Sequence, residues 1–153
     1  MQANKQKLFK YLKSQNLMAL ATYSRSIWIC TVYYVIDNDF NLYFVTSRKT
    51  KHGKMIEKNP RVACSIFDSH QKNKDYKVGA QVRGRVTIPR NAEKVKWALK
   101  IWNLHNPGLA HIINFKNMKE KVISAKIYKI TPDRIQFFNQ KLYGDDDYEI
   151  FNF

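Results

Sequence analysis

The sequence is poor in cysteine, glycine and proline, and each shortage excludes a class of protein. Its 153 residues include two cysteines, five glycines and four prolines. So few glycines and prolines leave no low-complexity linker that would divide the chain. Cys30 and Cys64 form no CxxC pair and have no histidine pair near them, so we expect reduced thiols and no metal site. No segment reaches the ~20 apolar residues of a membrane helix, and we therefore expect a cytoplasmic protein.

Acidic side chains are also scarce. Twelve Asp and Glu face 27 Lys and Arg, which gives a formal net charge of +15. This balance favours anionic partners, such as a phosphorylated cofactor, a nucleotide, nucleic acid or an acidic membrane. A cofactor phosphate would neutralise about two charges. We attribute the excess to a lysine-rich coding bias, so neither nucleic acid nor a membrane is the expected partner. A nucleic-acid-binding module that uses Arg83 and Arg85 stays an alternative.

The stretch from Leu42 to Phe67 is the most informative part of the chain. Its β-branched and aromatic residues up to Thr46 predict a strand. Thr50 then caps a helix of about two turns, which Asn59-Pro60 ends. A helix N-terminus normally attracts acidic side chains, but here it carries basic ones: Arg48, Lys49, Lys51, His52 and Lys54. This pattern predicts a phosphate at the helix N-terminus. The alternative is a solvated basic face.

Periodicity divides the rest of the chain into strands and helices around that stretch. Predicted helices span Gln2 to Gln15, Asn91 to Leu104, and a turn or two within Leu109 to Phe115. Predicted strands span Leu17 to Tyr23, Ile27 to Ile36, Arg61 to Phe67 and Val78 to Pro89, followed by a hairpin of Val122 to Ile130 and Arg134 to Asn139. We expect one domain, residues 1–153, with an exposed loop at 68–77. The acidic tail from Gly144 is expected to dock on a basic patch or to stay disordered.

Two of these elements carry wide apolar surfaces. Ile27 to Ile36 is apolar on both faces, so one face needs a cover other than the interior, which predicts a homodimer. The helix from Asn91 to Leu104 carries a wide apolar stripe that indicates core packing. Its tryptophans, Trp97 and Trp102, could instead wall a pocket.

Four segments together resemble a known family: Phe44-Val45-Thr46, Thr50-Lys51-His52, Asn59-Pro60-Arg61-Val62 and Gln81-Val82-Arg83-Gly84. The chain is similar to the pyridoxamine phosphate oxidase-like FMN-binding split barrels, and most to their small bacterial members. The resemblance implies a mainly β fold with helices (α+β), built as a split β-barrel. It also implies a homodimer that binds FMN at the subunit interface and acts on a small-molecule substrate.

The resemblance also implies which residues bind FMN. The flavin ring and ribityl chain would be lined by Thr31, Val32, Tyr33, Val45 and Thr46. The phosphate would be bound by Thr50, Lys51 and His52. The ring would also be reached by Gln81 of the partner subunit. Each has a plainer alternative as a strand or cap residue, and no catalytic residue stands out. His52 replaces the family's usual lysine, so we expect phosphate binding to weaken as its charge is lost above a pKa near 6.5.

The sequence does not support vitamin B6 oxidation. By the same resemblance, a true pyridoxamine phosphate oxidase carries a lysine on its second strand and a C-terminal tryptophan and arginine. Here no Lys or Arg occurs between Ser26 and Ser47, and no tryptophan follows Trp102. We expect a flavin-dependent oxidoreductase with another substrate. A non-catalytic flavin or haem carrier is the alternative, with His105 and His111 as candidate haem ligands.

Overall fold

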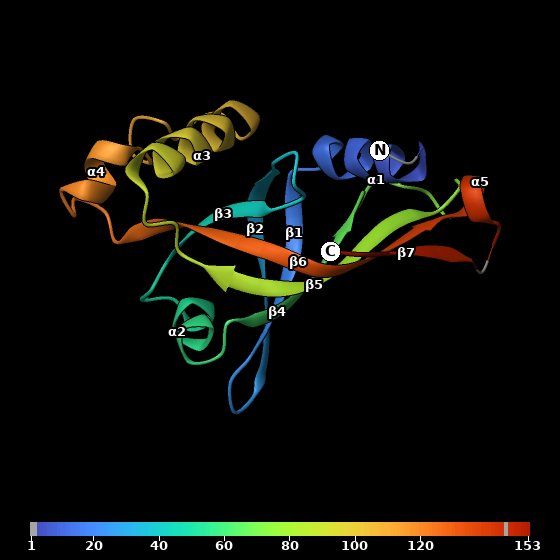
Figure 1. Cartoon of the computed structure of the whole chain (residues 1–153), viewed down its shortest axis with the longest axis horizontal. Coiled ribbons are helices and arrows are strands. Elements are labelled where there is room, and N and C mark those ends of the chain that lie inside the picture. The colour runs from blue at the N-terminus through green and yellow to red at the C-terminus, as the bar shows by residue number, and fades with distance from the viewer. Residues whose placement is uncertain (1–2, 146) are drawn as a thin grey trace.

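Six antiparallel strands close into a barrel in the computed structural model, which describes residues 3–145 and 147–153. They are β1 (Leu17–Tyr23), β2 (Ile27–Ile36), β3 (Leu42–Ser47), β4 (Arg61–Phe67), β5 (Val78–Thr87) and β6 (Ala125–Asn139). The strands neighbour one another in the order β3-β2-β1-β4-β5-β6, and β6 pairs with β3 to close the ring (Figure 1). A seventh strand, β7 (Tyr148–Asn152), extends the sheet beside the second half of β6.

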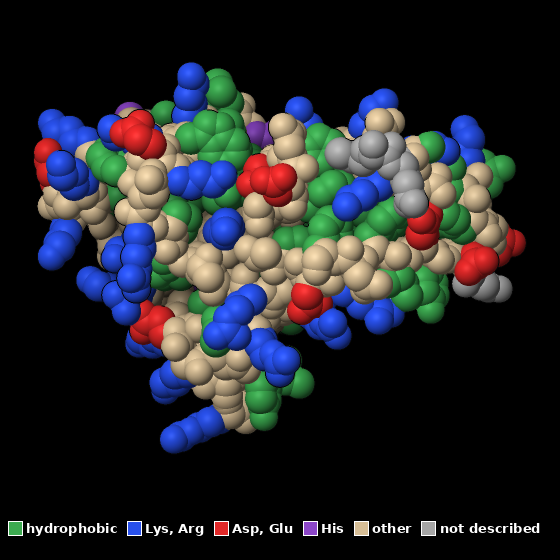
Figure 2. Space-filling view, viewed as in Figure 1, with side chains coloured by type: hydrophobic (Ala, Val, Ile, Leu, Met, Phe, Trp, Pro, Cys, Tyr) green, Lys and Arg blue, Asp and Glu red, His purple; other side chains and the backbone are tan. Residues whose placement is uncertain are grey.

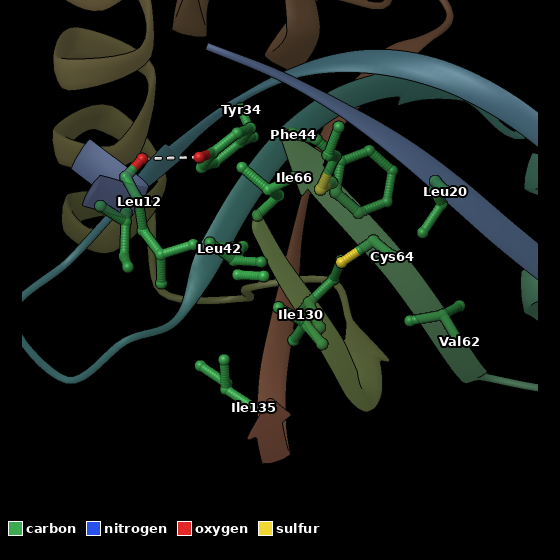
Figure 3. Packing of buried hydrophobic residues seen from close by; sticks show 14 of the residues in the cluster. Leu12, Leu20, Tyr34, Leu42, Phe44, Val62, Cys64, Ile66, Ile130 and Ile135 are labelled. Carbon is green, nitrogen blue, oxygen red and sulfur yellow. Dashed lines mark hydrogen bonds between the residues drawn. The ribbon is translucent and has the colours of Figure 1, made fainter. Parts of the chain in front are cut away.

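Alternate residues of each strand fill the barrel. On β1, for example, Met18 and Leu20 are fully buried while Leu17 is exposed. Figure 3 shows such inward side chains from several strands meeting at the centre. The helix α1 (Ala3–Ser14) closes one end of the barrel with Leu8 and Leu12, and the Tyr34 hydroxyl donates to the Leu12 carbonyl at 2.5 Å. The amphipathic pattern of this helix therefore serves the core.

The other helices lie outside the barrel. The longest, α3 (Ala92–His105), covers the outer face of β2, β3 and β6, where Ala98, Leu99 and Trp102 form a second buried cluster with Val35, Tyr43 and Ile127. Beside it lies α4 (Phe115–Lys119), whereas α2 (Lys51–Lys58) lies on the opposite side of the barrel from α1 and α3 (Figure 1). A short α5 (Gln140–Tyr143) follows β6. None of the described helices is long and apolar enough to cross a membrane.

Most predicted elements are confirmed. β1, β2 and β4 have the predicted bounds, β5 ends two residues early, and α2 begins after Thr50 as expected. The first helix begins at Ala3, and its predicted start at Gln2 lies outside the described residues. At Gly84 the β5–β6 register shifts. A Cβ at this position would lie 2.5 Å from the Thr131 carbonyl oxygen, so only glycine fits.

The predicted hairpin around Pro132 is wrong. β6 runs through this proline as one strand of 15 residues. Along one edge, β6 pairs with β3 up to Ile130 and with β7 from Arg134 onward. Pro132 lies between the two partners, where the hydrogen bond that it cannot donate is not needed. The opposite edge accommodates the proline at the register shift beside Gly84.

Of two further expectations near the C-terminus, the helical turn is confirmed and the one for the acidic tail is wrong. The Ile113 N–H donates to the Leu109 carbonyl at 2.7 Å, and α4 begins after this turn at Phe115, where the Asn114 side chain caps it by accepting from the Asn117 N–H at 2.9 Å. The acidic tail forms β7 instead of a loosely docked segment, although Asp146 lies outside the described residues. The Glu149 carboxylate accepts from Asn4 Nδ2 and from the Tyr143 hydroxyl, both at 2.8 Å, and so ties the tail to α1.

Candidate functional site

The barrel opens between β2 and β3. The two strands pair only from Tyr34 opposite Phe44 to Ile36 opposite Leu42. Beyond Tyr34 the described residues give this edge of β2 no partner strand, whereas β3 keeps its pairing with β6 as far as Ser47. The backbone groups along residues 27–33 of β2 therefore face a split rather than a neighbouring strand.

Helix α2 begins where β3 ends, beside this split. Thr50 is its N-cap: the Thr50 Oγ1 accepts from the Gly53 N–H at 3.0 Å and donates to the Ser47 carbonyl at 2.7 Å. The turn is so tight that a Cβ on Gly53 would lie 2.2 Å from the Ser47 oxygen. No acidic residue occupies the first turn, so the positive end of the helix dipole is not compensated by its own sequence.

His52 belongs to a hydrogen-bonded group with two threonines. Its Nε2 lies 2.6 Å from Thr46 Oγ1, which lies 3.4 Å from Thr50 Oγ1. When the ring is protonated, Nε2 donates to Thr46, Thr46 donates to Thr50, and the proton of Thr50 goes to the Ser47 carbonyl. The Nδ1–H of His52 is then left to donate to an anion. Burial lowers the pKa of this imidazole below its ordinary 6.5, because desolvation disfavours the charged ring.

Lys51 is held over an aromatic ring. Its Nζ lies 3.7 Å from the centroid of the Trp28 indole, on the β1–β2 hairpin that projects beside α2 (Figure 1). One turn later Met55 packs on Thr22 of the same hairpin, with the two side chains 3.6 Å apart. The cation–π contact thus links the first turn of α2 to the far end of the split.

The structure places Gln81 away from this group. The register aligns Thr31, Ala19, Ser65 and Gln81 in one row of outward-facing positions across β2, β1, β4 and β5. Three strand spacings separate Gln81 from Thr31, roughly 14 Å. Within one chain, therefore, the predicted site residues on β2, β3 and α2 surround the split, while Gln81 lies on the outer wall.

That outer wall is apolar at the β1–β2 end. Ile27 is 78% exposed, Ile29 63% and Tyr33 49%. Helix α3 covers only the last part of the outward face of β2, at Val35. Small side chains, Ala19, Ala21, Ala63 and Ser65, occupy the middle of the wall. The predicted need for a cover on the second face of β2 is therefore not met by the described residues of a single chain.

A buried hydroxyl also lies in this part of the barrel. Tyr128 is 1% exposed, and its ring stacks on Phe44 with centroids 5.4 Å apart. Its hydroxyl has no hydrogen-bond partner among the described residues. Burial raises the pKa of Tyr128, and the nearby Glu57 raises it further while Arg48 opposes this. Arg48 and Glu57 pair with each other at the surface of α2.

The candidate haem ligands lie elsewhere. His105 Nε2 lies 2.9 Å from the Gln15 carbonyl oxygen, a structural contact between the ends of α3 and α1. His111 is exposed in the turns before α4. Among the described residues, no group of three His, Cys, Asp or Glu side chains could hold a metal ion.

Comparison with known proteins supports the resemblance seen in the sequence. The family model described as pyridoxamine 5'-phosphate oxidase matches residues 5–139. The chain belongs to this family. A UPF0306 protein of Photorhabdus laumondii is 33% identical over 97 residues, which are 62% of this chain and 66% of that relative. The chain thus spans just under two thirds of the curated relative that it matches.

Solved structures show the fold of this family member. The General Stress Protein 26 of Bacillus anthracis superposes with a TM-score of 0.71 at 20% identity and covers 98% of both chains. A NimC/NimA family protein of Clostridium acetobutylicum gives 0.71 at 17% identity, covering 97% of this chain and 91% of its own. A heme binding protein of Mycobacterium smegmatis gives 0.73 at 13% identity, covering 94% of this chain and 56% of its own. The predicted α+β split barrel is confirmed.

Sequence reasoning missed two residues of the split. Trp28 appeared only as part of an apolar strand, because nothing local links it to Lys51, 23 positions later. Gly53 gave a signal that could have been used, since glycine is rare inside helices and here stands in a first turn. Both lie beside the Thr46, Thr50 and His52 group.

Proposed function

We propose that this protein binds FMN in the split between β2 and β3, with the phosphate at the N-terminus of α2. One observation carries the proposal: the positive end of α2 holds a capping threonine, Lys51 and His52 with no acidic residue in its first turn. Backbone N–H groups, the helix dipole, the Lys51 ammonium and, when it is protonated, the His52 ring together suit a doubly charged phosphate. A solvated basic face would not require the tight cap at Gly53.

The residues around the split fit the rest of the cofactor. Thr31, Val32 and Tyr33 offer the polar rim of a flavin a strand edge that pairs with no strand among the described residues. On β3, Thr46 lies beside the split, whereas the Val45 side chain packs with the cluster under α3, and the buried Tyr128 hydroxyl has no partner among the residues that the structure describes. Bound FMN supplies electron-transfer chemistry to a substrate, and the protein supplies binding, orientation and polarity. None of the described residues is assigned as catalytic.

We propose that two copies associate through the outer wall of β1 and β2. The exposed Ile27, Ile29 and Tyr33 supply apolar area, and the small side chains in the middle allow close approach. Within one chain, Gln81 lies too far from the split to contact a flavin bound there. In such a dimer, Gln81 of the partner subunit would reach that flavin instead. One dimer would then contain two sites, each made of residues from both chains.

The proposed activity is a flavin-dependent oxidoreductase acting on a small molecule in the cytoplasm. The cytoplasm is supported by two unpaired thiols: Cys64 is buried in the barrel and Cys30 is half-buried on β2. Lys and Arg side chains are spread over the face drawn in Figure 2, including α2 and α4, rather than gathered in one stripe. This spread favours a general surface charge over a nucleic-acid groove.

The test is a titration of the purified protein with FMN, followed by desalting and addition of NADH or NADPH. Retained flavin bands at one FMN per chain would support the site, and bleaching by a nicotinamide donor would support the enzyme. Retained flavin that no donor reduces would favour a carrier. A protein that never retains flavin would overturn the proposal.

Haem is the second candidate, because one structural neighbour is described as a heme binding protein. His105 is poorly suited as an axial ligand, since its Nε2 already contacts the Gln15 carbonyl. An absorption spectrum distinguishes haem from FMN. Haem that is added and retained would give a Soret band, and replacing an axial ligand, His105 or His111, would shift that band.

A further inference from the structure

A second cavity lies away from the split, between the ends of α1 and α3. Its volume is about 380 Å³, within the range of small-molecule sites. The cavity is floored by Leu12, Val35 and Ile36, and α3 forms one wall with Trp97, Ile101 and Leu104. In Figure 1 the two helices lie on the same side of the barrel, opposite α2. The cavity is therefore separate from the proposed flavin site.

Two apolar residues that line this cavity from α3 remain exposed. Leu104 is 72% exposed and Trp97 is 39% exposed, although both are large apolar side chains on the longest helix outside the barrel. The same helix buries Ala98, Leu99 and Trp102 fully against the barrel. Its apolar surface is therefore wider than packing on the barrel requires, and the surplus faces the cavity.

Two charged side chains, Lys13 and Asp37, line the cavity. The Asp37 carboxylate is already satisfied: it accepts from the Tyr43 hydroxyl at 3.0 Å, from Asn41, and lies 3.7 Å from Lys94 Nζ. Lys13 has no ion pair with any acidic residue that the structure describes. The cavity thus combines an apolar floor and an aromatic wall with one cation at its edge.

His105 adds a fixed hydrogen-bonding group. Its Nε2 donates to the Gln15 carbonyl at 2.9 Å, since a carbonyl can only accept. This hydrogen bond holds the side chain at the junction of α1 and α3, at the wall of the cavity.

We propose that this cavity binds an amphipathic anion with an aromatic or aliphatic body and one acidic group. The body would lie against Trp97 and Leu104 on α3, and the acidic group would face Lys13. The site does not depend on FMN, and it remains testable if the flavin proposal fails.

The experiment uses the full-length protein and the fluorescent aromatic sulfonate 1-anilinonaphthalene-8-sulfonate as the probe. The expected result is saturable binding that excess FMN does not displace. In ¹H–¹⁵N spectra, the indole signal of Trp97 should shift with the probe while that of Trp28, beside the split, should not. No saturable binding, displacement by FMN, or a shift at Trp28 alone would each overturn the proposal.

Two matched pairs of variants place the binding at this cavity. Leu104→Glu adds a negative charge at an exposed position of the wall, and Leu109→Glu makes the same change at a position that is 46% exposed and outside the lining. Lys13→Ala removes the cation, with Lys10→Ala on the same helix as its control. We expect Leu104→Glu and Lys13→Ala to weaken probe binding about two- to fivefold each, the effect of one exposed ion pair. Equal affinities within both pairs would refute the assignment.

Discussion

Replacing Lys51 by alanine tests the phosphate site most directly. A hydrogen bond to a charged group contributes about 1.5 to 3 kcal/mol. To make it, Lys51 must leave the Trp28 ring, 3.7 Å from its Nζ, and an exposed cation–π contact of this kind contributes about 0.5 to 1 kcal/mol. The difference is about 1.5 kcal/mol, so the dissociation constant for FMN should rise roughly tenfold in Lys51→Ala.

The control for this change is Lys58→Ala. Lys58 stands in the last turn of the same helix and is exposed, so the net charge changes equally. It lies seven residues from Lys51, about 10 Å along the axis, which is close to the screening length at 0.1 M salt. Titration of FMN fluorescence at pH 6 and 0.1 M salt gives both constants. If the two variants bind FMN equally well, Lys51 does not contact the phosphate.

Three further predictions concern pH, packing and assembly. FMN binding should weaken as the pH rises through the lowered pKa of His52, because phosphate favours the protonated ring. Without FMN, this histidine makes the folded state less stable as the pH falls below 6.5, since the unfolded chain binds the proton more readily. His52→Lys should remove both effects, measured by FMN titrations and thermal melts from pH 5 to 8. Gly84→Ala should lower the free energy of unfolding by about 1 to 3 kcal/mol in urea melts, because its Cβ would lie 2.5 Å from the Thr131 oxygen. In the control, Gly79→Ala, the nearest atom is 3.7 Å from the new Cβ, and equal unfolding midpoints for the two variants would refute the close approach. Ile29→Asp should convert the proposed dimer to a monomer in sedimentation velocity, and Val122→Asp, at a similar exposure of 67%, should leave it intact; a dimer that survives Ile29→Asp does not use this wall.

Local chemistry explains why so many elements could be predicted. The period-two pattern of β1, β2 and β4 marks strands whose alternate residues fill the barrel, and the structure gives them the predicted bounds. At α2, a capping hydroxyl and an Asn-Pro step act on backbone groups within four residues of themselves. These signals lie within short stretches of the chain, so they can be interpreted without knowledge of the fold.

The errors have the opposite origin. Pro132 predicts a turn, yet β6 continues because its neighbours on one edge change from β3 to β7 at that point. The acidic tail has no strong strand pattern, and it becomes β7 because the second half of β6 leaves an edge that needs a partner. Which edges remain free is decided only when strands from distant parts of the sequence have paired.

The candidate site divides in the same way. The turn that we propose as the phosphate site could be predicted from the sequence, since Thr50, Lys51 and His52 are neighbours at the start of one helix. Three other features of the site could not be predicted: β2 and β3 separate beyond Tyr34, Trp28 contacts Lys51, and Gln81 lies three strands away from Thr31. Contacts between residues many positions apart depend on how the barrel closes, and no local pattern of side chains encodes that closure.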